Sequence, residues 1–471
     1  MSVSVVMTYR LPNQWLMAYA KKSLRHKLPR EAMMTTPSTA LREPRALGPD
    51  TDPELHHAFT SLEFASAVDP YPLFHRLRRD YPVAELFGGV SVARYDDVQA
   101  VLRHPHVSTD DRTSALHHSL KEQNRLSAPY LSQLDQQSFL HRDPPEHTRL
   151  RKLVVQGFTP RRVEALRPFI QREVDAVLDA AAPQGRLEVI ADLAYPLPIA
   201  VICELLGIPA EDRDYVASWP RTQLCCTFET GSRNAAATLQ SASDDHPRQA
   251  EADRVQQQLT EYFADLIEHR RRAPGDDLVS ALIAAEENGG RLSAEEINAT
   301  LRLLFVAGYE NAVNLIGHGV LALLRHPDQW AALRQDPSLA GKAVDEVLRY
   351  DPPFQFTGRI ALEDLDIGGY RIARGQHMTL WLAAANRDPE HFTDPDRFDL
   401  HRGGGRHLAF GSGIHACLGG PLARMEAEVA FSTLARRLGE PRLETDPPRY
   451  RTDVFRSLDE LPITAHIATS A

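Results

Sequence analysis

The chain has 471 residues, and 43% of them are hydrophobic, which is enough to bury a sizeable core. Its 53 basic and 63 acidic residues give a net charge of −10, which argues against a general nucleic-acid-binding protein. Four cysteines without a CxxC pair make zinc and iron–sulfur sites weak interpretations, and they fit free thiols in a reducing cytoplasm. No run approaches the roughly 20 apolar residues of a transmembrane segment.

Residues 1–50 differ from the rest and are predicted to be an extension preceding a single domain at residues 51–471. The first 30 residues contain six basic side chains and no acidic one. The favoured interpretation is a disordered arm, or a true start at Met33 or Met34. The alternative is a surface-seeking helix with one apolar face, formed by Trp15, Leu16, Tyr19 and Leu24.

The organised part begins near Asp69. A helix is predicted in PYPLFHRLRRDYPV, a hairpin in VAELFGGVSVARY with Gly88 and Gly89 at its turn, and a helix in DDVQAVLRHP. Residues 105–140 are polar and weakly periodic, which predicts a long loop. The next helix begins in DPPEHTRLRKLVVQGF and places His147 and Arg151 on one face, which is ordinarily a solvated one.

Helices are predicted through LEVIADLAYPLPIAVICELLGIP. Residues 220–250 are polar and rich in small side chains, and we expect them to form a mobile cover over a pocket between two helices. The adjacent Cys225 and Cys226 are interpreted as plain helix residues and not as a vicinal disulfide.

A long central helix is predicted to begin at Ser293, which forms a capping-box pattern with Glu296. About 30 residues follow without a proline, and the middle of this helix is apolar on all sides, which predicts burial at the domain centre.

Two dipeptides interrupt the apolar middle of that helix. Ala307-Gly308 removes side-chain bulk, and Glu310-Asn311 places polar groups beside the gap. Glycine inside a helix costs about 1 kcal/mol, so something must approach closely there. Tight packing against another helix is the alternative to a ligand.

Farther on, Glu346 and Arg349 stand at i and i+3 in AVDEVLRYDPP, where a surface ion pair of little energetic value is the ordinary interpretation. The run FQFTGRIALEDLDIGGYRIARGQHMTLWLAAANRDP alternates as short strands and turns.

The stretch His407–Gly420, HLAFGSGIHACLGG, combines four glycines with one cysteine and leads into a helix. Gly411, Gly413 and Gly419 permit backbone conformations that other residues resist. Cys417 is predicted to lie at the N-terminus of the following helix, where the dipole and free N–H groups favour a thiolate. A thiolate presented by a glycine loop can serve as an axial ligand of haem iron.

Three other interpretations of this stretch remain open. A lone cysteine is most often a small buried hydrophobe. Gly411, Gly413 and Ala416 match the dinucleotide fingerprint GxGxxA, which requires a preceding strand. A catalytic pair of Cys417 and His415 is the third, although proximity in sequence orients neither side chain.

The same stretch resembles the haem-binding signature FGxGxHxCxG of the cytochrome P-450 family, with Phe410, Gly413, Cys417 and Gly419 in place. The resemblance extends from about Asp69 to the C-terminus. It implies a mainly α-helical single domain with small peripheral β-sheets, and haem b as the cofactor. It implies that Cys417 is the axial iron ligand.

The resemblance also implies roles for residues elsewhere in the chain. The haem propionates would bind His147, Arg151, Arg359 and His415. A buried structural cluster would consist of Glu346, Arg349 and Arg397. The substrate pocket would be lined by Leu303, Val306, Ala307, Phe354, Gln355, Phe356 and, in a last hairpin within RTDVFRSLDELPI, Phe455.

The central helix of the family carries AGxET or AGxDT over the oxygen site. In this chain Ala307-Gly308 would admit oxygen and Glu310 would relay protons, but Asn311 stands where the family usually has threonine. Asn311 is therefore a departure from the pattern at a catalytic position.

The resemblance implies a haem-thiolate monooxygenase that oxidises a hydrophobic specialised metabolite such as a macrolide or a cyclic peptide. Oxidative coupling or dehydrogenation at the same site is one alternative; a haem sensor and a nucleotide-binding dehydrogenase are others. No flavin or iron–sulfur segment is present, so a separate ferredoxin and ferredoxin reductase are implied. An acidic ferredoxin would dock on basic residues of the thiolate side, namely Arg149, Lys152, Arg402, Arg406, Arg424 and Arg436.

Overall fold

A computed structural model describes residues 41–61, 63–86, 88–122, 138–219, 247–285, 292–403, 405–446, 448–451 and 456–470. Residues Glu43–Ala471 form one compact unit. Strand β1 (Arg45–Ala46) pairs in parallel with β2 (Val83–Leu86), so residues 43–50, which we assigned to the extension, are built into the folded unit. The predicted features of residues 1–40 and the predicted cover at 220–246 lie outside the described residues.

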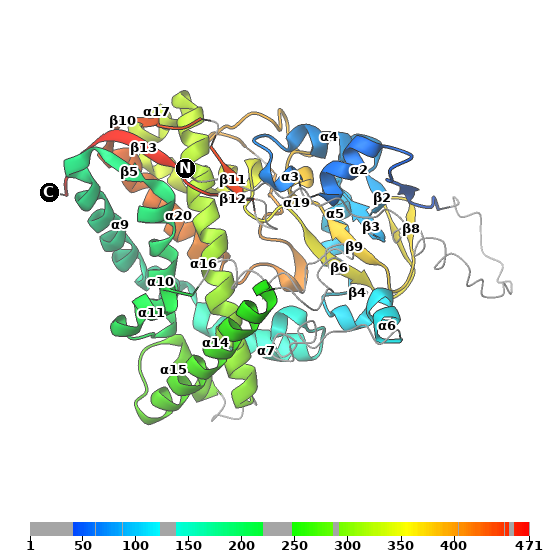
Figure 1. Ribbon diagram of the computed structural model, residues 1–471, viewed down its shortest axis with the longest axis horizontal. Helices are drawn as coiled ribbons and strands as arrows, with labels where there is room; N and C mark the ends of the chain where they lie inside the picture. The colour runs from blue at the N-terminus through cyan, green and yellow to red at the C-terminus, as the bar shows by residue number, and fades with distance from the viewer. Residues whose placement is uncertain are drawn as a thin grey trace. The chain divides into compact units, whose positions relative to one another are not determined.

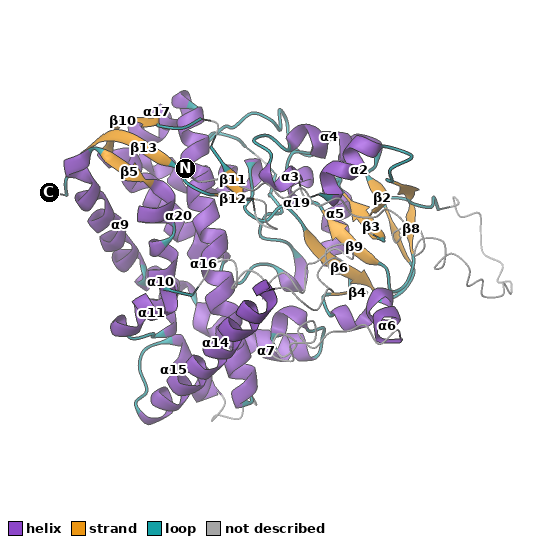
Figure 2. Cartoon of the chain, viewed as in Figure 1, coloured by secondary structure: helices purple, strands orange, loops and turns teal. Residues whose placement is uncertain are grey.

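Helices make up most of the unit, which confirms the mainly α prediction (Figures 1 and 2). The α-helices in the described residues are α2 (Pro53–Thr60), α3 (Glu63–Ser66), α4 (Tyr71–Asp80), α5 (Tyr95–Arg103), α6 (Ala115–Glu122), α7 (Glu146–Val155), α8 (Pro160–Ala165), α9 (Arg167–Ala181), α10 (Pro196–Leu206), α11 (Arg213–Ala217), α14 (Pro247–Arg272), α15 (Leu278–Ala285), α16 (Ala294–Arg325), α17 (Pro327–Gln335), α18 (Ala340–Tyr350), α19 (Leu382–Ala385) and α20 (Gly420–Arg437).

Short helical turns join several of these helices. They are η1 (Asp111–Thr113), η3 (Phe139–His141), η4 (Gln156–Phe158), η5 (Ala182–Gln184), the π-helical η6 (Val189–Ala194), η7 (Ala210–Asp212), η9 (Pro337–Leu339) and η10 (Gly413–His415). The predicted loop at 105–140 is therefore only partly a loop, since a strand, η1, α6 and η3 fall within its described part.

The largest sheet has six strands in the order β1-β2-β3-β9-β6-β4. The predicted hairpin of β2 and β3 is confirmed, and Gly88 at its turn has a φ of 73°, which favours glycine. The remaining sheets are β10-β13-β5, β11-β12 and β7-β8. The strand bounds after β2 are β3 (Gly89–Val92), β4 (Val107–Ser108), β5 (Arg186–Glu188), β6 (Thr357–Ala361), β7 (Leu365–Ile367), β8 (Tyr370–Ile372), β9 (His377–Leu380), β10 (Leu438–Leu443), β11 (Tyr450–Arg451), β12 (Ser457–Leu458) and β13 (Pro462–Ile467).

Helix α16 runs through the middle of the unit, with α9, α10 and α20 on one side of it and the six-stranded sheet on the other, and α14 crosses it in this view (Figure 1). Its start is fixed by the predicted capping box, in which Glu296 N–H donates to Ser293 Oγ (3.2 Å) and Ser293 N–H to Glu296 Oε2 (2.9 Å). A Cβ at Gly319 would lie 2.0 Å from the ring of Phe431 on α20. This close contact explains a helix-interior glycine that would otherwise cost about 1 kcal/mol.

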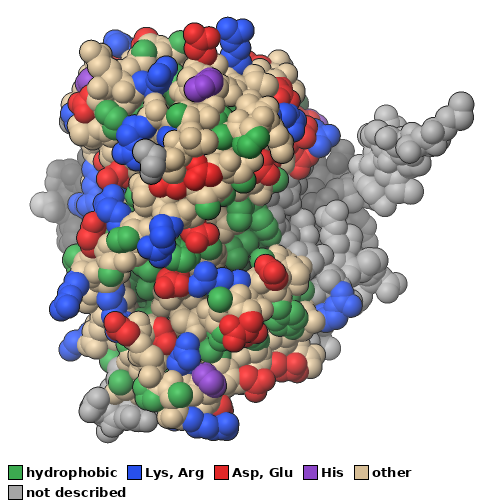
Figure 3. Space-filling view, turned by 90° about the vertical axis from the view of Figure 1, so that its left-hand side faces the viewer, with side chains coloured by type: hydrophobic (Ala, Val, Ile, Leu, Met, Phe, Trp, Pro, Cys, Tyr) green, Lys and Arg blue, Asp and Glu red, His purple; other side chains and the backbone are tan. Residues whose placement is uncertain are grey.

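One helical stretch of the described residues, Val189–Leu206, is long and apolar enough to cross a membrane, with a mean hydropathy of 1.9. However, 67% of it is buried inside the protein, as expected for a core helix. Figure 3 shows basic and acidic side chains interspersed over the face that lies to the left in Figure 1, with hydrophobic side chains gathered towards its centre. That face therefore carries no extended patch of one charge.

Candidate active site

The glycine-rich loop turns sharply to bring Cys417 in front of α20. Gly411 and Gly413 have φ values of 65° and 73°, and a Cβ at Gly413 would lie 2.4 Å from the carbonyl oxygen of Leu102 at the end of α5. These two positions therefore require glycine. Gly419 does not, because its φ is −77° and no protein atom lies within 4 Å of the Cβ it lacks. The loop closes through a hydrogen bond from Cys417 N–H to Phe410 O (2.8 Å).

Cys417 lies two residues before Gly419, the N-cap of α20. The residue is exposed at the surface of the loop, but many protein atoms lie near its thiol. These atoms displace water around the sulfur, and this desolvation raises the pKa of the thiol. The N–H groups of Gly419 and Gly420, and then Arg151, act in the opposite direction. The helix terminus thus favours a thiolate as predicted, but burial outweighs it. A bound metal cation would reverse this balance, since metal binding deprotonates a coordinating thiol.

The four predicted propionate ligands lie together. The imidazole rings of His147 on α7 and His415 in η10 have centroids 4.3 Å apart. Arg151, one turn after His147, donates to the carbonyl oxygen of Ala416. Arg359 is buried on β6, and its charge acts on His415.

This cluster carries more positive charge than the described residues around it neutralise. Burial, and after it the nearby Arg359, His147, Arg151 and His141, lowers the pKa of His415 to about 2. Burial also lowers the pKa of Arg359 to about 10, with Asp143 as the opposing acidic group. Among the described residues, neither ring nitrogen of His147, nor Nδ1 of His415, has a hydrogen-bond partner. Buried cations and unpaired donors of this kind fit a ligand with two carboxylates, such as a haem.

One stripe of α16 faces away from the protein core. Between residues 297 and 323 nearly every side chain is buried, but Leu303, Ala307 and Asn311, spaced four residues apart, are partly exposed. Oδ1 of Asn311 is nevertheless buried and has no hydrogen-bond partner. Glu310 beside it is buried. Of the predicted catalytic pair, Asn311 thus places an unpaired amide oxygen on the same stripe as the apolar Leu303 and Ala307.

Gly308, next to Ala307, is partly exposed and also lies against α10. A Cβ at Gly308 would lie 2.9 Å from Cδ1 of Ile202 on α10. The missing side chain therefore allows α10 and α16 to pack closely, which is the alternative to a ligand that the sequence left open.

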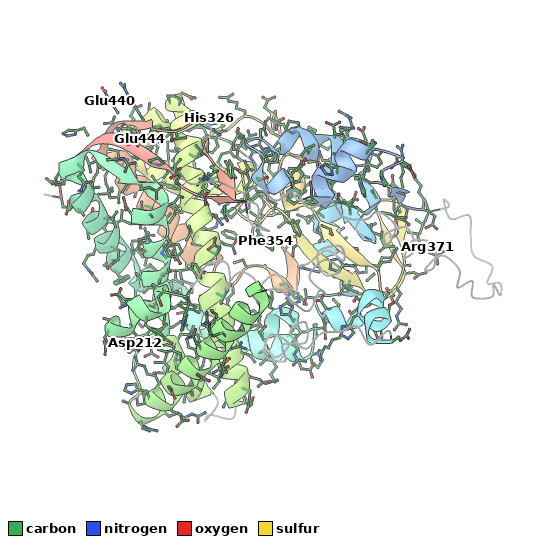
Figure 4. All side chains as sticks on the ribbon, in the orientation of Figure 1. Asp212, His326, Phe354, Arg371, Glu440 and Glu444 are labelled. Carbon is green, nitrogen blue, oxygen red and sulfur yellow. The ribbon has the colours of Figure 1, made fainter. Side chains whose placement is uncertain are left out.

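The predicted pocket residues divide into two groups. Phe354 is partly exposed and lies between α16 and β6 in the view of Figure 4. Gln355 and Phe356, by contrast, are buried in the core, where the Phe356 ring lies 5.1 Å from that of Trp381. Both side chains are enclosed by the protein interior, at 0% and 3% exposure, and so do not line an open pocket wall. Val306 is also buried, and Phe455 lies outside the described residues.

The predicted buried cluster is present, but with a different third member. Arg349 donates to both carboxylate oxygens of Glu346, at 2.8 Å each, and both residues are buried. The side chain of Arg397 is 65% exposed, and only its carbonyl oxygen accepts from Arg349 (3.0 Å). Arg402 takes its place, with Nε 3.1 Å from Glu346 Oε1 and a side chain only 12% exposed. Arg402 is consequently not available for ferredoxin docking, to which we had assigned it.

Three residues contribute to the site in ways that the sequence-based prediction does not include. Arg397 was assigned to the cluster through the family resemblance, and the sequence offered no signal that Arg402, five residues later in the same loop, is the residue that reaches Glu346. Asp143 accepts from Ser108 Oγ (2.5 Å) and opposes the charge of Arg359. Thr109 Oγ1 lies 3.3 Å from Nε2 of His415. The sequence offered no signal for Thr109, which β4 brings to the site from a distant segment.

The two competing interpretations of the loop do not fit the structure. The dinucleotide fingerprint needs a strand before Gly411, but residues 405–412 contain turns and no strand. A catalytic Cys–His pair needs a hydrogen bond between the two side chains. The ring of His415 contacts Thr109 and His147 instead.

A loop-borne cysteine before a helix, a long central helix and a cluster of buried cations together define a haem-binding monooxygenase site. The family model for cytochrome P-450 matches residues 89–448, so the chain belongs to this family and is a cytochrome P-450 monooxygenase. It is 41% identical over 418 residues to the cytochrome P-450 monooxygenase PikC of Streptomyces venezuelae, covering 84% of this chain and 91% of PikC.

Two further comparisons agree. The chain is 41% identical over 325 residues to 6-deoxyerythronolide B hydroxylase of Saccharopolyspora erythraea, covering 68% of this chain and 76% of that protein. A crystal structure of a myxobacterial cytochrome P-450 in complex with myristic acid superposes with a TM-score of 0.76 at 38% identity, covering 89% of this chain and all of that one.

Proposed function

We propose that this monooxygenase binds haem b through the Cys417 thiolate and hydroxylates a hydrophobic specialised metabolite, such as a macrolide or a cyclic peptide. The observation that carries this proposal is the convergence of His147, Arg151, Arg359 and His415 beside Cys417, with unpaired imidazole nitrogens and excess positive charge. The names of the relatives support the substrate class, since one of them hydroxylates 6-deoxyerythronolide B.

Each residue of the cluster would hold part of the cofactor. Arg359 and Arg151 would donate charge-assisted hydrogen bonds to the propionates, and the free nitrogens of His147 and His415 would donate two more. A haem with an anionic sulfur ligand supplies the chemistry, namely the activation of O2 towards an unreactive carbon. Leu303, Ala307 and Phe354 would exclude water and orient the substrate on the opposite side.

Asn311 determines how protons reach the reaction centre. Its amide can hold a water molecule or an oxygen atom by hydrogen bonds, but it has no O–H group that could relay a proton. We therefore assign proton delivery to Glu310 through ordered water, or to a hydroxyl group of the substrate. Oxidative coupling or dehydrogenation at the same site is the second candidate reaction, in which oxygen is consumed but not inserted into the product.

Electrons would come from a separate ferredoxin and its reductase. Lys152, Arg406 and Arg436 are exposed, whereas Arg149 pairs with Glu296 and Arg424 pairs with Asp345. The three exposed residues are therefore the first candidates for an acidic docking partner in the cytoplasm. We also propose that a chain starting at Met33 suffices to bind haem and substrate.

The test is the difference spectrum of the reduced, carbon-monoxide-bound protein. A band at the wavelength typical of thiolate-ligated haem is expected, and a haem-loaded sample without it would overturn the proposed ligation. Candidate metabolites are then added to the oxidised protein, and a spin-state shift identifies those that bind beside the iron. Product analysis after turnover separates hydroxylation, which adds one oxygen atom, from coupling or dehydrogenation, which adds none.

A further inference from the structure

The stripe of α16 that carries Leu303, Ala307 and Asn311 continues for two more turns. Asn314 and His318 follow Asn311 at helical spacing on the same side, and both are buried. Unlike the earlier residues they make polar contacts: Asn314 Nδ2 donates to Ser457 Oγ of β12 (3.1 Å), and His318 Nδ1 lies 3.0 Å from the carbonyl oxygen of Asp351. Burial lowers the pKa of His318, so the neutral ring donates from Nδ1.

These two contacts lead to one buried ion pair. Arg456, which directly precedes β12, donates from Nε to both carboxylate oxygens of Asp351, at 3.0 and 3.2 Å. Their side chains are 2% and 14% exposed. Asp351 directly follows α18 and stands three residues before Phe354 in the sequence. Arg456 N–H also donates to Pro353 O (3.4 Å).

The remaining groups around the pair are satisfied by other parts of the chain. Arg456 Nη1 and Nη2 donate to the carbonyl oxygens of Ala67 (2.5 Å) and Val68 (2.9 Å). The guanidinium lies 3.8 Å from the centre of the Tyr450 ring, and Tyr71 Oη donates to Asp351 (3.0 Å). Figure 1 shows the strands β11 and β12 beside α16 and close to α3, where these segments meet.

The ion pair therefore joins two segments that border the stripe. One is residues 351–354, which ends in the partly exposed Phe354, and the other is the β11–β12 pair, which is attached to α16 through Asn314. We propose that Asp351 and Arg456 are positioning residues that fix the separation of these two segments above Asn311 and thereby set which bulky ligands fit the active site. This proposal rests on the proposed function, since it takes the face around Asn311 as the substrate side.

The geometry distinguishes this role from simple stabilisation. A guanidinium offers its donors in a rigid planar fork, and the nitrogens of Arg456 are divided between two segments: Nε is directed at Asp351, and Nη1 and Nη2 at the carbonyl oxygens of residues 67–68. Removing the fork frees the β12 side of the site while leaving Cys417 and the four propionate ligands untouched, because none of them contacts this pair. Substituting Arg456 or Asp351 should therefore change ligand selectivity without changing haem binding.

The experiment uses the full-length haem-loaded protein and two iron-binding probes, imidazole and econazole, whose dissociation constants are read from the shift of the haem absorption band. Imidazole is too small to touch both walls, whereas econazole must fit between them. For Arg456→Gln we expect the econazole constant to rise by about tenfold or more, and the imidazole constant to change by no more than about twofold. Asp351→Asn should likewise raise the econazole constant and leave the imidazole constant nearly unchanged. The double variant should bind econazole only slightly more weakly than either single variant.

The matched control is Arg437→Gln. Arg437 is buried and bonds to Asp175 and Asp179, so its loss also breaks a buried ion pair, but between α20 and α9. It should lower thermal stability without changing the ratio of the two constants.

If Arg456→Gln loads haem and keeps the wild-type ratio, the pair is only stabilising and the positioning proposal is wrong. Should Arg456→Gln not fold, Arg456→Lys, which keeps the charge but loses the planar fork, is judged by the same ratio. A wild type that shows no spectral response to imidazole would instead reject the haem site itself.

Discussion

The imidazole rings of His147 and His415 lie 4.3 Å apart, although one belongs to α7 and the other to the loop before α20. Both are surrounded by cationic side chains, and the ring nitrogens of His147 have no hydrogen-bond partner. An arrangement that is unfavourable for the protein alone becomes favourable when an anionic ligand enters it. The predictions on cofactor binding follow from this relationship.

Arg359→Leu should weaken haem retention without weakening the haem-free protein. A hydrogen bond to a charged group contributes about 1.5–3 kcal/mol, so haem transfer to apomyoglobin should become about ten- to a hundredfold faster. In the haem-free form the substitution removes a repulsive charge, so the thermal midpoint should stay the same or rise. Arg371→Leu on β8 is the control, because Arg371 forms an exposed pair with Asp364. Equal haem loss in both variants would contradict the assignment of Arg359.

Cys417→Ser should leave the fold intact, since the loop is held by Gly411, Gly413 and the backbone bond from residue 417 to Phe410. A serine hydroxyl does not replace the thiolate as a strong electron donor to iron. The carbon-monoxide band should therefore lose its thiolate position, and substrate oxidation should stop, while the circular dichroism spectrum stays that of the wild type. A retained thiolate band would exclude Cys417 as the ligand.

Arg402→Leu should destabilise the protein far more than Arg397→Leu. The first change removes a cation from the buried carboxylate of Glu346, and breaking such a pair costs about 3–5 kcal/mol. The second removes only an exposed side chain, because Arg397 serves the cluster through its carbonyl oxygen. Urea unfolding of both variants measures the difference. Equal losses, or a larger loss for Arg397→Leu, would restore our original assignment.

Asn311 is tested by the coupling of electron use to product formation. If its amide holds water or oxygen near the reaction centre, Asn311→Ala should release more hydrogen peroxide per substrate consumed. Asn311→Thr supplies a relaying hydroxyl and should release less. The measurement is peroxide and product per electron pair, in the wild type and in both variants. An Asn311→Ala variant that matches the wild type in rate and coupling would show that the amide has no role.

Glu426 should make stability depend on pH. It is buried on α20, Oε2 has no partner, and burial raises the pKa of its carboxyl to about 8. Because the folded pKa lies above the unfolded value of about 4.3, the folded protein binds the extra proton between these two values, and stability falls as pH rises through this window. Glu426→Gln should remove this slope, giving a higher thermal midpoint than the wild type at pH 8 and a similar one near pH 4. Glu428→Gln, on the exposed side of the same helix, should leave the slope unchanged.

The structural features that the sequence predicted correctly are mainly those that depend on a short-range pattern of residues. The capping box of Ser293 and Glu296, the Gly88 turn and the start of α20 before Pro421 are set by residues a few positions apart, and all are confirmed. The residues proposed to bind the propionates were predicted only through the family resemblance, because nothing local shows that α7 and β6 meet. Gln355 and Phe356 were wrongly placed on the pocket wall for the same reason, since burial of an extended segment depends on the sheet it joins.

Arg349 has a further consequence for how this chain can vary. Its guanidinium donates to the backbone oxygens of Asn386 (3.2 Å), Pro395 (2.7 Å) and Arg397 (3.0 Å), and Arg402 adds Asp394 (3.0 Å). Carbonyl oxygens are common to all residues, so side chains at 393–397 can be exchanged with little effect on these bonds. Their spacing cannot: inserting or deleting one residue moves each following carbonyl by about 3.3 Å along the chain, beyond hydrogen-bond reach. Asp394, with a φ of 46°, and Asp396, which pairs with Arg387, still restrict the residue type at their own positions. At the other positions of this loop, natural and engineered variation should change the residue type more readily than the length.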